Sequence, residues 1–181
     1  MRRSPARAWR SPGAAPRDPA RPDWPHLEAA LRAADPRLRL ARPPDGPALA
    51  VLARELAATE WADPQRDPVP PLMAFLDKPD NGLPLILVED GALLGLCLLQ
   101  RLSAPLDGGG QLCLDDLYVR VAARGRGLGG ALMKGVEALG RALGVRYLYL
   151  HVEPENTAAQ ALYARHGLVH ADSRIMDKLY F

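Results

Sequence analysis

The residues best suited to chemistry form a glycine-rich loop at residues 124–130, with the sequence RGRGLGG. The loop follows a predicted strand that ends at Val119 and precedes a predicted helix that contains Leu132. Glycines let several backbone N–H groups turn toward one point, at which the dipole of the following helix is also positive. This arrangement predicts an anion site that fits a diphosphate. Arg124 and Arg126 either add charge-assisted hydrogen bonds to phosphate oxygens or lie in solvent as loop residues.

Two other glycine-loop nucleotide sites fit this chain less well. Gly125, Gly127 and Gly130 satisfy the dinucleotide pattern Gly-x-Gly-x-x-Gly, and Glu153 follows at the spacing of a ribose-binding acid. A dinucleotide fold needs repeated parallel βαβ units after the loop, whereas about 50 residues remain here and a predicted hairpin precedes the loop. A nucleoside-triphosphate P-loop is excluded because no Lys-Ser or Lys-Thr follows the glycines.

The elements that position the loop alternate between strands and helices. Asp90-Gly91 lies between two apolar runs, which is the strongest short-range signal for a β-hairpin. Apolar residues recur at helical spacing over residues 129–143, and Gly144 ends that helix. The fold class is therefore α/β (α+β), with helices against a mixed sheet. We expect strands at 37–41, 85–89, 93–99, 111–119, 145–152 and 174–181, and helices at 46–59, 72–76, 129–143 and 158–165.

Three motifs in a fixed order resemble the GNAT superfamily of N-acetyltransferases over about residues 37–181. They are LDDLYV at 114–119, RxxGxG at 124–129 and NxxAxxLYxxxGL at 156–168. The first is similar to the corresponding strand of diamine and polyamine acetyltransferases, with Asp115 in place of a glutamate. The resemblance implies a largely antiparallel central sheet with a splayed strand pair that binds acetyl-CoA, the acyl-donor cosubstrate.

In that superfamily the strand corresponding to 111–119 diverges from the strand corresponding to 145–152, commonly at a β-bulge. The resemblance implies that the pantetheine arm of acetyl-CoA enters this gap and pairs with strand backbone, while the glycine loop holds the pyrophosphate. Asn156 would bond the arm, although asparagine is also a preferred helix N-cap. The residues assigned to acetyl-CoA in this way are Leu117, Tyr118, Val119, Arg124, Gly125, Arg126, Gly127, Leu128, Gly129, Gly130 and Asn156.

Acetyl transfer to an amine requires a base, because an alkylamine with a pKa near 10 is protonated at neutral pH. Asp115 is the predicted base; the alternative is that it only binds substrate charge or caps a loop. Strand alternation predicts that Asp115 and Asp116 lie on opposite faces. Tyr163 is the predicted acid for the leaving thiolate, and its alternative is an aromatic on the packed face of its helix. The N–H of Leu117 is a candidate donor to the developing oxyanion.

Composition excludes several classes of protein. The formal charge is +2, with the basic excess concentrated in the first ten residues, so nucleic-acid binding has little support. No apolar run approaches the roughly 18 residues that cross a bilayer. Cys97 and Cys113 fall in apolar strands, which fits buried thiols in a reducing cytoplasm, and the four histidines show no metal-ligand spacing with them. We predict no metal, no nucleic-acid partner and no membrane association.

The chain begins with a stretch rich in proline and arginine that cannot offset its ordering entropy by burying apolar surface. We predict a flexible tail over residues 1–35 and one acetyltransferase domain over 36–181. The expected function is direct acetyl transfer to a primary amine of a small molecule by a cytoplasmic enzyme, with a second copy as partner if it forms a homodimer. The alternatives are a protein N-terminal or lysine acetyltransferase and a non-catalytic acyl-CoA-binding regulatory domain.

Overall fold

The computed structural model describes residues 23–60, 66–76, 82–104 and 109–171. The predicted last strand at 174–181 and the first 22 residues lie outside these ranges. Within them, no helix combines the length and the apolar character needed to span a bilayer.

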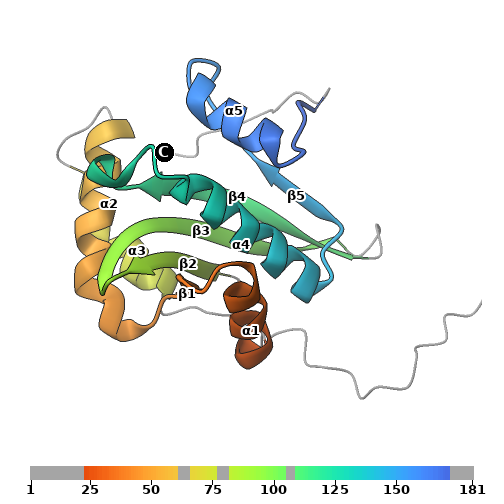
Figure 1. The fold of residues 1–181 in the computed structure, drawn as a ribbon, viewed down its shortest axis with the longest axis horizontal. Coiled ribbons are helices and arrows are strands. Elements are labelled where there is room, and N and C mark those ends of the chain that lie inside the picture. Colours follow the sequence, from red (N-terminus) through yellow and green to blue (C-terminus); the bar gives the residue numbers. More distant parts are fainter. Residues whose placement is uncertain (1–22, 61–65, 77–81, 105–108, 172–181) are drawn as a thin grey trace, which may run out of the picture.

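A five-stranded sheet in the order β1-β2-β3-β4-β5 forms the centre of the fold (Figure 1). The first four strands are antiparallel neighbours, and β5 runs parallel to β4. This arrangement confirms the predicted mixed, largely antiparallel sheet flanked by helices. The strands are β1 (Leu38–Leu40), β2 (Gly82–Glu89), β3 (Ala92–Ala104), β4 (Gly109–Val119) and β5 (Tyr147–Leu150).

The β2–β3 hairpin forms at the predicted dipeptide. Asp90 and Gly91 have φ angles of 51° and 76°. Positive φ at both central residues is what a two-residue turn needs to match the twist of the flanking strands. The turn therefore sets the register in which Glu89 lies opposite Ala92.

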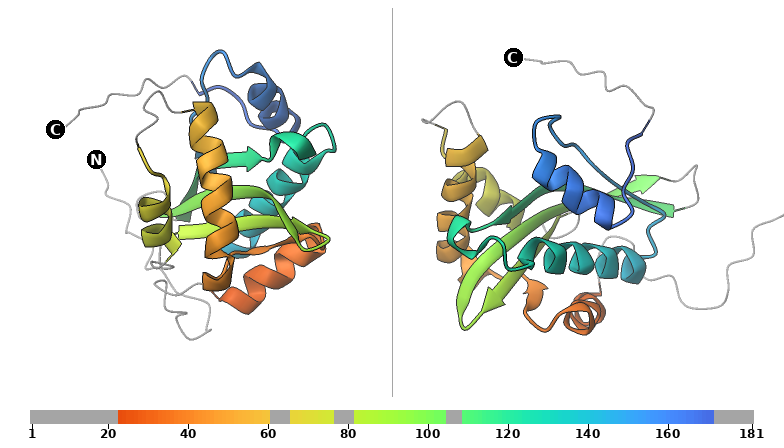
Figure 2. Two further views of the ribbon diagram at one scale, coloured as in Figure 1. Left: turned by 90° about the vertical axis from the view of Figure 1, so that its left-hand side faces the viewer. Right: turned by 45° about the horizontal axis from the view of Figure 1, so that its top comes forward.

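Helices cover both faces of the sheet (Figure 2). On one face α1 and α4 pack against the sheet, with Leu31, Leu132 and Val136 fully buried in a shared apolar cluster. On the other face α2 and α3 bury Leu52 and Leu72 in a second cluster. The helices are α1 (Trp24–Ala34), α2 (Gly46–Glu60), α3 (Val69–Leu76), α4 (Leu128–Leu143) and α5 (Thr157–Arg165), with short 3-10 helices at Pro43–Asp45 and Val121–Ala123.

The α1 helix corrects one prediction. It lies within the stretch 1–35 that the sequence predicted as a flexible tail, so that prediction fails for residues 24–34. Asp23 caps the helix by accepting a hydrogen bond from the N–H of His26, and Leu27 and Leu31 are buried against the α4 side of the sheet. Leu27, Leu31 and the preceding Trp24 recur at helical spacing, a pattern that the nearby prolines obscured.

Candidate active site

The site begins where β4 and β5 separate. Their parallel pairing extends from Gln111 opposite Tyr147 to Leu114 opposite Leu150 and stops there. The β4 strand continues to Val119, paired only with β3 over this stretch. The N–H of Arg120 donates to the carbonyl of Leu94 on β3. Because a ladder alternates its direction residue by residue, the N–H groups of Val119 and Leu117 point to the opposite side, into the gap.

A β-bulge coincides with the separation. Leu98 lies opposite Asp116 and Leu99 opposite Leu114, so Asp115 is the extra residue on β4. A bulge bends its strand and increases the local twist, which gives a physical cause for the divergence of β4 from β5. The position agrees with the splay that the resemblance implied for strands 111–119 and 145–152.

The bulge also overturns the prediction that Asp115 and Asp116 lie on opposite faces. Leu114 and Leu117 are three residues apart, yet both pack into the cluster on the α4 face. The two aspartates between them both line a cavity on the α2–α3 face. Strict alternation fails because the bulge inserts one residue, and the result is a pair of adjacent carboxylates on a single face.

The glycine loop has the backbone geometry expected of the predicted anion site. Gly125 and Gly127 both have φ of 77°, and a Cβ at either position would meet no atom within 4 Å, so the loop borders open space. Gly127 is the N-cap of α4 and has no side-chain cap, and the helical ladder starts with the N–H of Ala131 donating to Gly127. The preceding N–H groups of the first turn are therefore left for an external acceptor.

The two loop arginines have different surroundings. The Arg124 Nε donates to the carbonyl of Val119 at 3.0 Å, and its guanidinium lies 5.5 Å from the centre of the Tyr118 ring. Arg124 is therefore held where β4 meets the loop. Arg126 instead forms an ion pair with Glu89 on the hairpin. This ion pair favours a structural role for the Arg126 side chain over the predicted contact with a phosphate.

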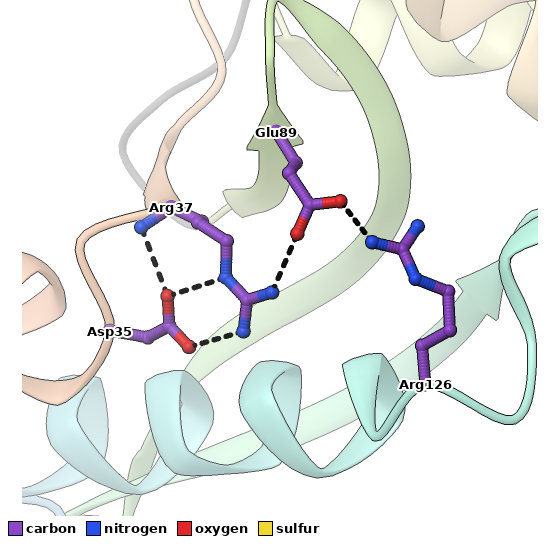
Figure 3. A network of polar contacts seen from close by, with 4 residues as sticks. All are labelled: Asp35, Arg37, Glu89 and Arg126. Carbon is purple, nitrogen blue, oxygen red and sulfur yellow. Dashed lines mark hydrogen bonds and ion pairs between the residues drawn. The ribbon is translucent and has the colours of Figure 1, made fainter.

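Figure 3 shows that Arg126 belongs to a longer network. Glu89 also accepts from Arg37 Nη1 at 2.9 Å, and Arg37 bonds Asp35 through Nε at 3.0 Å and Nη2 at 2.8 Å. Hydrogen bonds from Arg126 and then Arg37 lower the pKa of Glu89, and those from Arg37 lower the pKa of Asp35. The network ties the glycine loop to the β2–β3 hairpin and to the end of α1.

The α5 helix borders the gap from the side of α4. A Cβ on Gly129 would lie 3.2 Å from Leu162 Cδ2, so glycine at this position lets α5 pack closely on the first turn of α4. Asn156 accepts a hydrogen bond from the N–H of Ala159 at 3.1 Å, which is the N-cap role considered from sequence. Tyr163 is partly buried against the α4-face cluster. Asp115 and Tyr163 thus approach the gap from opposite faces of the sheet.

A thiol and a phenol adjoin Asp115. Cys113 Sγ donates to Asp115 Oδ1 at 3.2 Å, and Tyr149 on β5 hydrogen-bonds the same thiol. Burial, followed by the bond to Asp115, raises the pKa of Cys113 to about 11. Burial is also the main cause of the raised pKa of Tyr149. The thiol is therefore neutral at physiological pH and acts as a hydrogen-bond donor that orients the carboxylate.

A cavity of about 310 Å³ opens beside the two aspartates on the α2–α3 face. Side chains of α2, α3, β3 and β4 form its walls. Its lining residues are Ala53, Leu56, Ala57, Arg66, Pro68, Pro71, Leu72, Phe75, Leu96, Leu98, Gln100, Asp115 and Asp116. The cavity lies on the α2–α3 side of the sheet and α4 on the other, and the β4–β5 pairing ends at Leu114 and Leu150, next to Asp115.

Another hollow among the described residues lies away from the splayed strands. It has a volume of about 800 Å³ and lies between α1 and the segment 41–43, and Glu28 and Trp24 are among its lining residues. It contains none of the residues at the splayed strands, so we do not assign the chemistry to it. Among the described residues, no group of three or more His, Cys, Asp or Glu is arranged to hold a metal ion.

Comparison with known proteins agrees with this geometry. A sheet that divides between β4 and β5, with a glycine loop at the N-terminus of α4, has the form expected of an acetyltransferase. A sequence model of the acetyltransferase (GNAT) family matches residues 50–168, well over half of the chain, and the chain belongs to this family. A search of curated proteins found no match.

Several solved structures share the fold. An integron cassette protein, HFX_CASS3, from the mobile metagenome of Cole Harbour Salt Marsh is 28% identical, with a TM-score of 0.69 over 81% of this chain and 91% of that one. A ribosomal-protein-alanine N-acetyltransferase from Brucella melitensis biovar Abortus 2308 is 20% identical, with a TM-score of 0.67 over 78% and 99%. A possible acetyltransferase from Clostridium difficile 630 is 18% identical, with a TM-score of 0.72 over 80% and 97%.

Sequence reasoning missed part of the acceptor side. Cys113 and Asp115 are two residues apart on one strand, a spacing that places side chains on the same face and could have suggested their contact. Phe75, Leu56 and Leu98 converge on the cavity from three separate elements. No local pattern in the sequence marks that convergence.

Proposed function

We propose that the protein is an N-acetyltransferase that moves the acetyl group of acetyl-CoA directly to a primary amine of a small molecule. The proposal rests on the positions of two candidate sites, one for the acyl donor and one for the acceptor, next to the point where β4 and β5 separate. The glycine loop leads into α4 on one face of the sheet, and β4 has an unpaired edge beyond Leu114. A cavity of about 310 Å³ with Asp115 in its wall lies on the other face. A cavity of this size falls at the lower end of small-molecule sites.

The residues present fit the acyl donor. The first turn of α4, with Gly127 as an N-cap that lacks a side-chain bond, would hold the pyrophosphate. The N–H of Val119 and the carbonyl of Leu117, on the unpaired edge of β4, would hold the pantetheine arm. Acetyl-CoA supplies an activated thioester, so that the amide C–N bond forms as the C–S bond breaks and CoA thiol leaves. By the family resemblance, Asn156 and Arg124 would add side-chain contacts to the donor.

Asp115 and Tyr163 handle the protons in this proposal. Asp115 takes a proton from the bound ammonium, directly or through one water, so that the neutral amine attacks the thioester carbonyl, and Tyr163 gives a proton to the departing sulfur. The N–H of Leu117 points into the gap and donates to the developing oxyanion. The Cys113 thiol holds Asp115 Oδ1, which leaves the other carboxylate oxygen to face the cavity.

The cysteines support direct transfer over a covalent acyl-cysteine intermediate. Nucleophilic cysteines need a thiolate at working pH. Burial raises the pKa of both Cys97 and Cys113, the only two cysteines of the chain. Neither thiol is activated for attack on a thioester.

Acetylation of a protein amino terminus is the second candidate. It is favoured by the fold that the chain shares with a ribosomal-protein-alanine N-acetyltransferase, a likeness at 20% identity that concerns the fold alone. The limited cavity volume favours a small molecule instead. The likeness of the 114–119 strand to diamine and polyamine acetyltransferases, the cytoplasmic location and the homodimer stay predictions.

The test measures release of free CoA from acetyl-CoA with a panel of amines, for the wild type, for Asp115→Asn and Tyr163→Phe, and for the isosteric control Asp90→Asn in the β2–β3 turn. We expect Asp115→Asn to lower kcat by about 10²- to 10⁴-fold at pH 7, as removal of a general base does. The loss should shrink as the pH approaches the amine pKa near 10, because the free amine no longer needs a base. An Asp115→Asn enzyme with wild-type kcat at pH 7 would exclude the base role.

A further inference from the structure

We propose that the acceptor is a small monoamine carried on an apolar alkyl or aryl body, and that diamines and polyamines are poor acceptors. This inference rests on the proposed function and narrows its substrate class. It follows from three properties of the cavity beside Asp115: its apolar walls, its charge and the pairing of the acids around it.

The walls are mostly hydrocarbon. Nine of the thirteen lining residues are apolar, and the polar ones are Arg66, Gln100, Asp115 and Asp116. Leu56 and Leu72 are buried in the α2–α3 cluster, and Phe75 and Leu98 are half-buried beside them. A ligand that fills this space exchanges water for carbon contacts, which stabilises an apolar body by about 0.8 kcal/mol for each buried methylene.

The charge of the cavity suits one cation. Among the described residues, two carboxylates and one guanidinium line it, which gives this lining a formal charge of −1 at neutral pH. One ammonium placed near Asp115 balances that charge. A second ammonium on the same chain would lie against leucine and phenylalanine side chains, and burying an unpaired charge there is strongly unfavourable.

Two acids that are sequence neighbours of lining residues already have arginine partners. Glu55 forms a bidentate pair with Arg120, with Nε at 3.1 Å and 3.2 Å from its two oxygens. Asp67 lies 3.8 Å from the guanidinium of Arg54. In the structure their charges are compensated, so within the part of the chain that the structure describes the cavity wall offers only the carboxylates of Asp115 and Asp116.

The decisive probe is a matched pair of acceptors, hexylamine and 1,6-diaminohexane, which differ by one terminal ammonium. We expect kcat/KM for hexylamine to exceed that for the diamine by more than about tenfold, with 2-phenylethylamine also accepted and spermidine poor. Lengthening the series from propylamine to hexylamine should raise kcat/KM by about threefold to fourfold per methylene until the cavity is full.

Two variants test the wall itself. Leu98→Asp adds a carboxylate to the apolar wall and should shift the ratio of kcat/KM toward 1,6-diaminohexane. Phe75→Ala removes aromatic surface and should lower kcat/KM for 2-phenylethylamine more than that for propylamine. Val51→Ala, on the exposed side of α2, is the control that should change neither ratio. If Leu98→Asp does not fold, as judged by its thermal transition, the test relies on Phe75→Ala. The ratio of kcat/KM for 2-phenylethylamine to that for propylamine is then compared between Phe75→Ala and the wild type.

Each outcome has a defined meaning. A preference of the wild type for 1,6-diaminohexane or spermidine overturns the inference and leaves the proposed function standing. Faster acetylation of a peptide amino terminus than of any small amine overturns the inference together with the small-molecule part of the function. Retained binding of CoA with no acetylation of any amine overturns the inference and the proposed transferase activity.

Discussion

The two faces of the sheet are built in different ways. On the α4 face the features expected to bind the acyl donor follow one another within 114–130, a strand edge, a loop and a helix start. On the α2–α3 face the cavity is assembled from segments between residues 53 and 116. The first face uses backbone N–H groups, and the second uses side chains. The contrast implies that the donor site tolerates side-chain change, whereas the acceptor site depends on it.

The sharpest test of the donor face is Gly127→Ala compared with Gly91→Ala. Both glycines have positive φ, 77° and 76°, with open space at the Cβ position, so the backbone strain should be similar, about 1 kcal/mol. Only Gly127 aims the N–H groups at the start of α4. We expect the Kd for acetyl-CoA, measured by titration calorimetry, to rise by about 10- to 100-fold in Gly127→Ala alone, as loss of one or two charge-assisted hydrogen bonds would cause. Equal effects of the two substitutions would show that strain, and not anion binding, explains the change.

The two loop arginines provide the next comparison. Arg124→Gln should raise the Kd for CoA by about tenfold, because Arg124 is held at the junction of β4 and the loop. Arg126→Gln should leave that Kd within about twofold and instead lower the thermal transition temperature, because it breaks the pair with Glu89. A larger effect of Arg126→Gln on CoA binding would reverse this assignment.

The Cys113 thiol donates a hydrogen bond to Asp115, the proposed base. Cys113→Ala removes the donor that holds Asp115 Oδ1, and we expect kcat to fall by about threefold to tenfold, the cost of one hydrogen bond, with KM for acetyl-CoA unchanged. Cys113→Ser keeps a donor and should recover most of kcat. If serine and alanine lower kcat equally, the thiol acts through packing and not through its hydrogen bond.

The smallest expected effect is on stability. The hydrogen bond to Arg37 is the main cause that lowers the pKa of Asp35 below its ordinary value of 3.8 in the folded state. The pair therefore stabilises the folded state fully above pH 3.8. This stabilisation is lost as the pH falls below 3.8 toward the pKa of the folded state. Arg37→Gln should cost about 1 kcal/mol at pH 7, and the difference from wild type should shrink below pH 3.8. Urea unfolding at several pH values measures this. Arg54→Gln, whose exposed pair with Asp67 spans 3.8 Å, should have almost no effect.

Local signals predicted most of the elements and the place of the glycine loop, while the binding of the acyl donor there stays a prediction. The Asp90-Gly91 turn, the apolar stripe of α4 and the glycine loop each depend on neighbouring residues, and the structure has them where they were expected. The bulge at Asp115 was implied only by resemblance, because no residue type marks a bulge in this strand. The prediction that Asp115 and Asp116 lie on opposite faces was therefore wrong, because the bulge adds one residue to the strand.

The acceptor face was beyond sequence reasoning for a physical reason. Phe75 and Leu98 line one cavity although more than twenty residues separate them, and their approach depends on how α3 packs against the sheet. The α1 helix was missed for a similar reason, because its two buried leucines are stabilised by packing against α4, which is distant in sequence. Long-range packing, and not local propensity, determines both regions.

The central claim is that backbone N–H groups of 117–130 hold the acyl donor, and amide hydrogen exchange tests it most directly. Adding saturating CoA should slow exchange in peptides that cover Leu117 to Gly130, with little change in peptides of α1 or around the 41–43 hollow. Slowed exchange confined to the α1 hollow, or no change within 117–130 despite saturated binding, would contradict the account.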